Sequence, residues 1–414
     1  MAIWPFKSKP EAVTKAPAIQ NETVNITDAE RMSDLFLGAK NSTGIVVNAD
    51  TAMRASSVYA CVRLVAGAIG SMPLGIYKRA GDSREAINEH PMARAIRVQP
   101  NPMLSASVYW ETVASHILLA GNSYSLIGRG RGEQALDLTP LKPNAVNIEE
   151  KSGRLMYFIT LGNGTYVAYD QDDILHIPGV GWNGLKGLSA IAYAGQNSIG
   201  GALAADEYSA KFFANDATPR GYLKFDKKLS PEQAEILRDY WYRKHQGIDN
   251  SHLPAIITEG GEFKTTTVSA EDSQLLETRR FQVADICRIF GVPPFMVGET
   301  DKSTSWGSGI EQQSIGFIRY TLRPHLTRIE QEINRKLFTG AANKNIFAEF
   351  QTHDLMRGDT AGRSAAYQIA LGGNQAPGWM TINEVRKAEN LPSITDGDEV
   401  YKPLTGAPSE PRND

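Results

Sequence analysis

The motif in this sequence that most clearly indicates a ligand-binding site is rich in glycine. Residues Gly179–Gly184 (Gly-Val-Gly-Trp-Asn-Gly) match G-x-G-x-x-G, between a strand-like run at 174–177 and a helical pattern. In dinucleotide-binding proteins such glycines let the backbone approach a pyrophosphate at a helix N-terminus. The acidic residues about twenty positions further on, Asp206 and Glu207, lie inside the helical pattern and not after a second parallel strand. We favour a glycine-rich hinge here and keep a nucleotide-dependent enzyme as the alternative.

Other residue types with catalytic potential lack the spacing that their chemistry needs. Lys302-Ser303 follows Gly298, but Asp301 stands where a phosphate loop carries glycine before its lysine. The seven histidines form no H-E-x-x-H or paired-ligand pattern, and G-x-S-x-G is absent. We therefore predict no catalytic residue, no metal site and no cofactor. The histidines, expected to be structural or on the surface, are His90, His116, His176, His245, His252, His325 and His353.

Composition and charge restrict the function further. The 414 residues include 43 basic and 46 acidic side chains, a net charge of −3, so no global positive field drives tight binding to phosphate backbones. The longest apolar stretch, Val58–Ile69, contains Arg63 and is shorter than the roughly 20 residues that a bilayer requires. Met1–Pro10 lacks the apolar region of a signal peptide. We expect neither a membrane segment nor a signal peptide.

The two cysteines, Cys61 and Cys287, are far apart in the sequence, and each lies in an apolar, helix-like stretch. This placement favours buried reduced thiols over a disulfide or a metal site. It indicates folding in a reducing, cytosolic environment.

The first half of the chain predicts an α+β domain. An arm without sustained periodicity covers residues 1–50, and apolar residues at steps of three and four then predict a helix over Ala55–Ser71. A second helix is predicted at Val108–Leu119. Short alternating runs separated by turn residues favour a mostly antiparallel sheet. The expected strands cover residues 74–78, 124–128, 136–140, 156–161, 166–169 and 174–177.

Two long helices flanking a small insert follow. Leu188–Ala214 is rich in alanine and glycine, and Ser269–Phe290 starts with a capping signal and is followed by Gly291 and two prolines. Adjacent Gly200 and Gly201 each cost a helix about 1 kcal/mol relative to alanine, so we expect a neighbouring backbone to approach closely there. The insert, Thr218–Gly261, is predicted as a strand at 222–225, a helix opened by Ser230-Pro231 and a strand at 255–258.

The remaining sequence predicts a polar loop at Gly298–Gly309, a helix with a kink at Pro324, and a strand at Phe347–Gln351 that returns to the first domain. Two short helices at 360–371 and 382–389 complete it. The basic side chains of the long helix favour a solvated or intersubunit face paired with Glu330 and Glu332 over direct DNA contact. They are Arg319, Arg323, Arg328, Arg335 and Lys336.

Several short motifs in a fixed order resemble the portal proteins of long-tailed phages. These motifs are Ser57–Arg63, Pro73–Tyr77, Pro140–Pro143, His176–Gly179, Gly291–Pro294, and Thr381–Arg386 with Gly397-Asp398. The resemblance covers roughly Ala55 to Tyr401. It implies a portal fold of the α+β class, with a wing, two long stem helices flanking a small α/β clip, a tunnel loop with a long helix, and a small α-helical crown.

The resemblance also implies boundaries for these parts. It gives 1–50 as a mostly flexible N-terminal arm, 51–187 as wing, 188–216 as stem helix, 217–266 as clip, 267–292 as stem helix, 293–357 as tunnel loop, long helix and wing return, 358–402 as crown, and 403–414 as a flexible tail.

The implied function is that of a homo-oligomeric ring at a capsid vertex, a dodecamer in the virion, through which double-stranded DNA of any sequence is packaged and ejected. The implied partners are other copies of the chain, the DNA, the large terminase subunit, a head–tail adaptor protein and the major capsid protein, with no membrane. The implied location is the virion, and the host cytoplasm during assembly. Another structural head–tail connector is a further alternative.

Three sets of residues are candidates for these roles. The tunnel loop, expected to face the lumen, comprises Thr300, Asp301, Lys302, Ser303, Thr304, Ser305 and Trp306. The residues expected to pack the stem are Gly195, Gly200, Gly201, Ala204 and Ala205. The clip residues expected to bind a partner are Lys227, Lys228, Trp241, Tyr242 and Arg243, although one of the two aromatic residues could instead fill the core of the insert.

Overall fold

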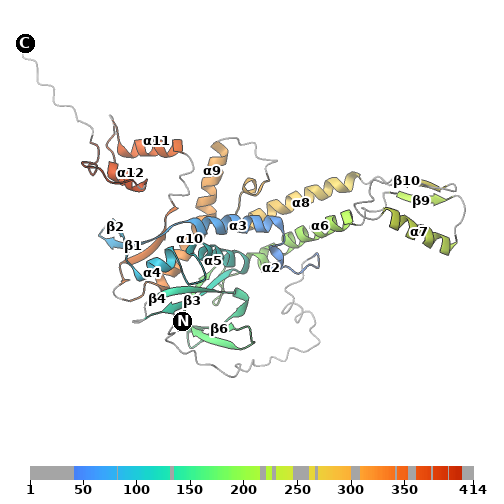
Figure 1. Cartoon of the computed structure of the whole chain (residues 1–414), viewed down its shortest axis with the longest axis horizontal. Coiled ribbons are helices and arrows are strands. Elements are labelled where there is room, and N and C mark those ends of the chain that lie inside the picture. Colours follow the sequence, from blue (N-terminus) through green and yellow to red (C-terminus); the bar gives the residue numbers. More distant parts are fainter. Residues whose placement is uncertain are drawn as a thin grey trace, which may run out of the picture. The chain divides into compact units, whose positions relative to one another are not determined.

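The structure is a computed structural model (Figure 1). It describes residues 42–81, 83–130, 135–214, 221–225, 230–245, 261–265, 269–299, 308–340, 343–352, 360–373, 376–389 and 391–402. The chain divides into two compact units, Met1–Phe350 and Gln351–Asp414.

Helices α3 (Ser56–Ser71) and α5 (Ala106–Ala120) pack together in the first unit. Burial of Val58, Val62 and Val65 accounts for the predicted apolar face of α3. A Cβ atom at Gly70 would lie 2.8 Å from the carbonyl oxygen of Ser107, so the two helices approach closely there. Two short helices, α2 (Ala49–Ala52) and α4 (Pro91–Arg97), and the 3₁₀ turn η2 (Pro143–Ala145) were not predicted.

Three antiparallel sheets accompany these helices and confirm the predicted α+β class. One has the order β11-β1-β2, the second β4-β3-β8 and the third β5-β6-β7. Their strands are β1 (Leu74–Ala80), β2 (Ser83–Ala86), β3 (Asn122–Arg129), β4 (Ala135–Leu141), β5 (Val146–Lys151), β6 (Arg154–Thr160), β7 (Tyr166–Asp170), β8 (Ile174–Pro178) and β11 (Ile346–Phe350). Leu74 pairs with Phe350, which confirms that the late strand returns to the first domain.

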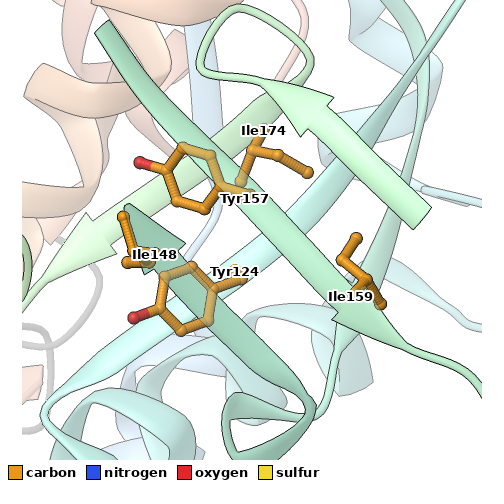
Figure 2. Packing of buried hydrophobic residues seen from close by; sticks show 5 residues of the cluster. All are labelled: Tyr124, Ile148, Tyr157, Ile159 and Ile174. Atoms are coloured by element: carbon orange, nitrogen blue, oxygen red, sulfur yellow. The ribbon is translucent and has the colours of Figure 1, made fainter. Parts of the chain in front are cut away.

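A hydrophobic cluster joins the second and third sheets. It contains Tyr124 of β3, Ile148 of β5, Tyr157 and Ile159 of β6, and Ile174 of β8, all at most 9% exposed. Figure 2 shows both tyrosine rings among the three isoleucines, with their hydroxyl groups toward the same side of the cluster. The two sheets therefore share one core, with polar atoms at its edge.

The long helices agree with the predicted pattern, with two local departures. A π-helical turn η3 (Ile191–Gly195) precedes α6 (Gln196–Ala214), and α8 spans Ser269–Phe290 as predicted. After the 3₁₀ turn η5 (Pro294–Val297), α9 (Ser308–Gly316) leads through a π-helical segment η6 (Phe317–Leu322) into α10 (Arg323–Lys336). The backbone irregularity expected at Pro324 thus lies mainly in the turn before it.

The insert between α6 and α8 contains β9 (Gly221–Phe225), α7 (Pro231–His245) and β10 (Gly261–Thr265). The backbone amide of Gln233 donates to Ser230 Oγ, and that of Ser230 donates to Gln233 Oε1, which confirms the predicted capping box. The predicted second strand at 255–258 lies outside the described residues. β9 pairs antiparallel with β10, a strand that was not predicted.

The second unit contains α11 (Thr360–Leu371) and α12 (Ile382–Ala388), as predicted. Thr381 and Glu384 form a reciprocal capping box at α12. Asn383, 6% exposed, donates from Nδ2 to Ile394 O and to Asp398 Oδ1, while the backbone amide of Ile394 donates to its Oδ1. The two late motifs therefore meet, and their polar residues have a structural role.

Candidate functional site

The glycine motif at 179–184 connects a sheet to the first long helix. It follows β8, which pairs antiparallel with β3, and the described residues around it contain no parallel β-α-β unit. Gly181 and Gly184 have φ values of +74° and +102°, in the left-handed region where only glycine is unstrained. The dinucleotide interpretation lacks the parallel strand that it needs.

Three glycines bring three backbone segments together at this connection, and we call Gly121, Gly179 and Gly187 the glycine junction. The backbone amide of Gly179 donates to the carbonyl oxygen of Gly121 at 2.8 Å. A Cβ atom at Gly187 would lie 2.7 Å from both that oxygen and the Gly179 nitrogen. A Cβ atom at Gly121 would lie 2.2 Å from the carbonyl oxygen of Leu188. The end of α5, the end of β8 and the segment that leads into the long helix therefore touch through their backbones.

A buried chain of polar groups ties the junction to the sheet core. Tyr157 OH and His176 Nδ1 lie 3.0 Å apart, and His176 Nε2 lies 3.0 Å from Asn122 Oδ1. Asn122 Nδ2 donates to Gly187 O at 2.8 Å, and Gly187 N donates back to Oδ1 at 2.7 Å. The bonds are satisfied together when the tyrosine donates to a neutral His176 protonated at Nε2. Asn122 thus hydrogen bonds to both the backbone N–H and the backbone C=O of Gly187.

Burial keeps His176 uncharged. Loss of solvation, together with the nearby positive charges of Arg335 and Lys336, lowers the pKa of His176 to about 3. The ring also stacks near Tyr124, with 4.5 Å between the ring centroids. The structural role predicted for this histidine is confirmed.

The depressed pKa of His176 predicts an acid-dependent loss of stability. Below about pH 6.5 the unfolded chain binds a proton that the folded chain excludes, so the free energy of unfolding falls from there towards pH 3. We expect His176→Gln to flatten this dependence while His325, whose burial lowers its pKa to about 4, contributes equally to both proteins. Urea unfolding at several pH values measures the two slopes, and identical slopes would contradict the assignment.

Polar side chains join α6 and α8 in an antiparallel register. Ser198 near the start of α6 hydrogen bonds to the carboxylate of Asp285 late in α8. Further along, Arg279 donates to Asp206 Oδ1 at 2.6 Å and to Ser209 Oγ at 3.2 Å. Figure 1 shows the two helices side by side. These contacts place the second half of α6 beside the middle of α8.

Gly201 allows α8 to approach α6. A Cβ atom there would lie 2.6 Å from Gln282 Nε2, so the close neighbour within the chain is a side chain and not the predicted backbone. At Gly195 the nearest atom to such a Cβ is Ile199 Cδ1 of the same helix, at 2.8 Å. The packing role between subunits stays a prediction for Gly195, Gly200, Gly201, Ala204 and Ala205.

The basic side chains of the long helix do not share one environment. Arg335 donates to Glu332 at 2.6 Å, as the charge pattern predicted. Glu330, however, is buried and accepts a hydrogen bond from the Phe350 backbone amide at 2.9 Å. Lys336 is also buried, bonds to the Gln171 carbonyl oxygen and lies 3.6 Å from Asp172. The prediction of a solvated or intersubunit face is therefore wrong at these two positions, which are buried within the chain.

The tunnel-loop candidates, Thr300 to Trp306, lie outside the described residues, between Gly298, whose φ is +93°, and α9. The clip candidates Lys227 and Lys228 also lie outside them. Trp241, Tyr242 and Arg243 lie in α7, but their side chains are not among those described. The roles of these residues stay predictions.

Within the described part of the chain, no three His, Cys, Asp or Glu side chains are placed to hold a metal ion. None of the helices described there has the length and apolar character to cross a membrane.

Asn122 and Tyr157 were missed from the sequence. Asn122 follows Gly121, and a Gly-Asn pair after a helix is typical of an exposed turn. Tyr157 lies in an apolar strand, where its ring alone explains its presence. Only contact with His176 reveals the shared role.

The chain matches known proteins along most of its length. The model of the family described as phage portal protein matches residues 56–390. The probable portal protein of Streptomyces phage phiC31 is 35% identical over 376 residues, covering 87% of this chain and 80% of that protein. The portal protein of Enterobacteria phage HK97 is 33% identical over 376 residues, covering 89% and 87%.

A solved structure shares the fold. The neck of a native gene transfer agent particle, computed with C12 symmetry, superimposes with a TM-score of 0.58 at 22% identity, over 88% of this chain and 99% of that one. The family match, the two phage relatives and the arrangement of antiparallel sheets and long helices lead to the same conclusion: the chain belongs to the phage portal protein family.

Proposed function

We propose that this chain forms a ring of identical subunits, a dodecamer in the virion, through which double-stranded DNA passes during packaging and ejection. The observation that carries the proposal is the similarity to two phage portal proteins over most of the length of all three chains. The C12 symmetry of the similarly folded gene transfer agent neck supports the subunit number. We assign the chain no catalytic role.

Within the ring, we propose that α6 and α8 are the stem, that residues 217–266 are the clip, and that residues 358–402 belong to the crown. The clip would dock the large terminase subunit, and the ring would also bind the head–tail adaptor and the major capsid protein. Exposed aromatic side chains support contacts between subunits, because such groups concentrate at interfaces. They are Tyr193 of η3, Tyr208 of α6 and Phe281 of α8.

Ring formation is the test of this proposal. Electron microscopy of the purified full chain is expected to show closed rings with a central hole wide enough for a DNA duplex. A protein that stays monomeric under all assembly conditions would contradict the proposal.

Ala204→Leu tests the stem. Ala204 is half-buried in the single chain, and an added side chain at a packed subunit contact is expected to weaken assembly roughly tenfold. Ala365→Leu on the exposed face of α11 adds the same atoms and serves as the matched control. Mass photometry compares the ring populations, while thermal unfolding checks that both subunits fold. Equal ring yields would remove Ala204 from the subunit contact.

The loop before α9 is expected to act on DNA and not on assembly. Residues Thr300–Ser305 carry four hydroxyl groups, one lysine and one aspartate, a composition without net charge that is suited to a sliding contact with phosphates. Deleting Thr300–Ser305 should leave rings intact and reduce the amount of DNA packaged or retained. Replacing the same residues with a Gly/Ser sequence of equal length separates the length of the loop from its side chains. Normal packaging by the deletion variant would refute the lumen assignment.

A further inference from the structure

Two buried thiols that are far apart in the sequence face one another in the first unit. Cys61 of α3 and Cys287 of α8 are 0% and 1% exposed, and their Sγ atoms lie 4.0 Å apart. The burial predicted for both thiols is confirmed, and both are free in the structure. Their separation of 226 positions in the chain concealed the contact.

The geometry places a disulfide within reach. A disulfide requires sulfur atoms about 2 Å apart, so the two must approach by roughly another 2 Å. Helices α3 and α8 already pack against each other. Rotation of one or both thiols about the Cα–Cβ bond moves sulfur without moving either helix axis.

The contact also makes the two thiols chemically different. A hydrogen bond from the Cys61 thiol lowers the pKa of Cys287, because it stabilises a thiolate there. The same bond, followed by burial, raises the pKa of Cys61. The direction of these shifts favours Cys287 as the first thiol to ionise and as the nucleophile of the reaction below, with Cys61 as its proton-bearing neighbour.

We propose that Cys61 and Cys287 are a site of oxidation by peroxide, which closes a disulfide between α3 and α8. The oxidant must be small because both sulfur atoms are buried, and hydrogen peroxide meets this requirement. The oxidation of the two thiols does not require that the chain forms a ring. Its biological setting, a particle that leaves the reducing cytoplasm, rests on the proposed function.

The reaction balances in two steps. The Cys287 thiolate attacks one oxygen of hydrogen peroxide, the O–O bond breaks, and hydroxide leaves and takes up a proton to form water, giving a sulfenic acid. Cys61 then loses its proton and its sulfur attacks the sulfur of Cys287. The S–S bond forms, the S–O bond breaks and a second water leaves. Two thiols are oxidised and one peroxide is reduced.

The bond would tie together distant parts of the first unit. It closes a loop that contains all three strands of the β5-β6-β7 sheet, the whole of α6 and the insert. Loops of this size restrict the unfolded chain strongly, so we expect the temperature of unfolding to rise by roughly 5–10 °C.

The test oxidises the native full chain with hydrogen peroxide and compares it with Cys61→Ser and Cys287→Ser. The intact mass of the wild-type protein is expected to fall by two hydrogens, and digestion should yield one cross-linked peptide containing both cysteines. Its unfolding temperature should rise on oxidation and return to the original value on reduction. Cys61→Ser should stop at an oxidised or trapped Cys287, and Cys287→Ser should react least. Cys61→Ala replaces the serine variant if the hydroxyl prevents folding.

Other outcomes would overturn the proposal. The first is that both thiols of the wild-type protein stay reduced at peroxide concentrations that oxidise exposed methionine. The second is that a cysteine is oxidised to sulfinic acid and no cross-link forms. The third is that disulfides form only between different chains. Rings are counted by electron microscopy in the same samples. If the disulfide forms in protein that makes no rings, the oxidation site stands and the proposed function is refuted. If rings form but the disulfide does not, the proposed function stands and the oxidation site is refuted.

Discussion

Gly121→Ala is expected to lower the free energy of unfolding by about 4 kcal/mol. The φ of +73° at Gly121 disfavours any side chain, and the new Cβ atom would lie 2.2 Å from the Leu188 carbonyl oxygen and 2.6 Å from the Ser189 nitrogen. These are backbone atoms, so no rotamer change relieves the contact. The long helix would have to move away from α5. Denaturant unfolding followed by tryptophan fluorescence measures the loss.

Gly153→Ala is the matched control for this prediction. Gly153 has a φ of +77°, and nothing lies within 4 Å of a Cβ atom there. Its substitution should therefore lower the free energy of unfolding only by the cost of the backbone strain, about 1 kcal/mol. If both variants lose the same stability, close packing at the glycine junction is not the cause.

Asn122→Ala is expected to cost about 3–5 kcal/mol. The change leaves His176 Nε2 and both polar groups of the Gly187 peptide without their partner, in a place where Asn122 is 3% exposed. Buried polar groups that lose their hydrogen bonds forfeit their hydration without replacement.

Asn147→Ala provides the comparison, because Asn147 is exposed on β5 and its removal should change stability by less than about 0.5 kcal/mol. Denaturant unfolding of the two variants gives the difference. A cost at Asn122 as small as at Asn147 would mean that other groups replace the lost bonds.

Periodicity predicted α3 well, because Val58, Val62 and Val65 are buried on one face of that helix. Periodicity failed to predict elements whose buried residues do not recur at a regular spacing. β2 is exposed at all four positions, and its Ser-Arg-Glu-Ala sequence carries no apolar signal. In the insert, β10 was missed because its Gly-Glu-Phe-Lys-Thr sequence has one large apolar residue.

The candidate site was harder to predict than the fold. The order of motifs predicted the family, because each motif is local in sequence. The contacts of Asn122 with Gly187, and of Cys61 with Cys287, join residues distant in the chain, and neither residue type indicates its partner. A glycine that serves a turn and a glycine that admits a neighbouring backbone also look alike until the neighbour is known. Spatial proximity is the information that a single sequence lacks.

The antiparallel pairing of α6 and α8 has a consequence for how such proteins diversify. Ser209, late in α6, contacts Arg279 in the middle of α8, and Ser198, near the start of α6, contacts Asp285 late in α8. Because the two helices are antiparallel, the end of α6 and the start of α8 lie at the same end of the pair, so the length and sequence of the insert can change without altering the register of the helices. If the insert docks partners as proposed, its exchange between related chains would transfer that specificity while the rest of the subunit keeps its own evolutionary history.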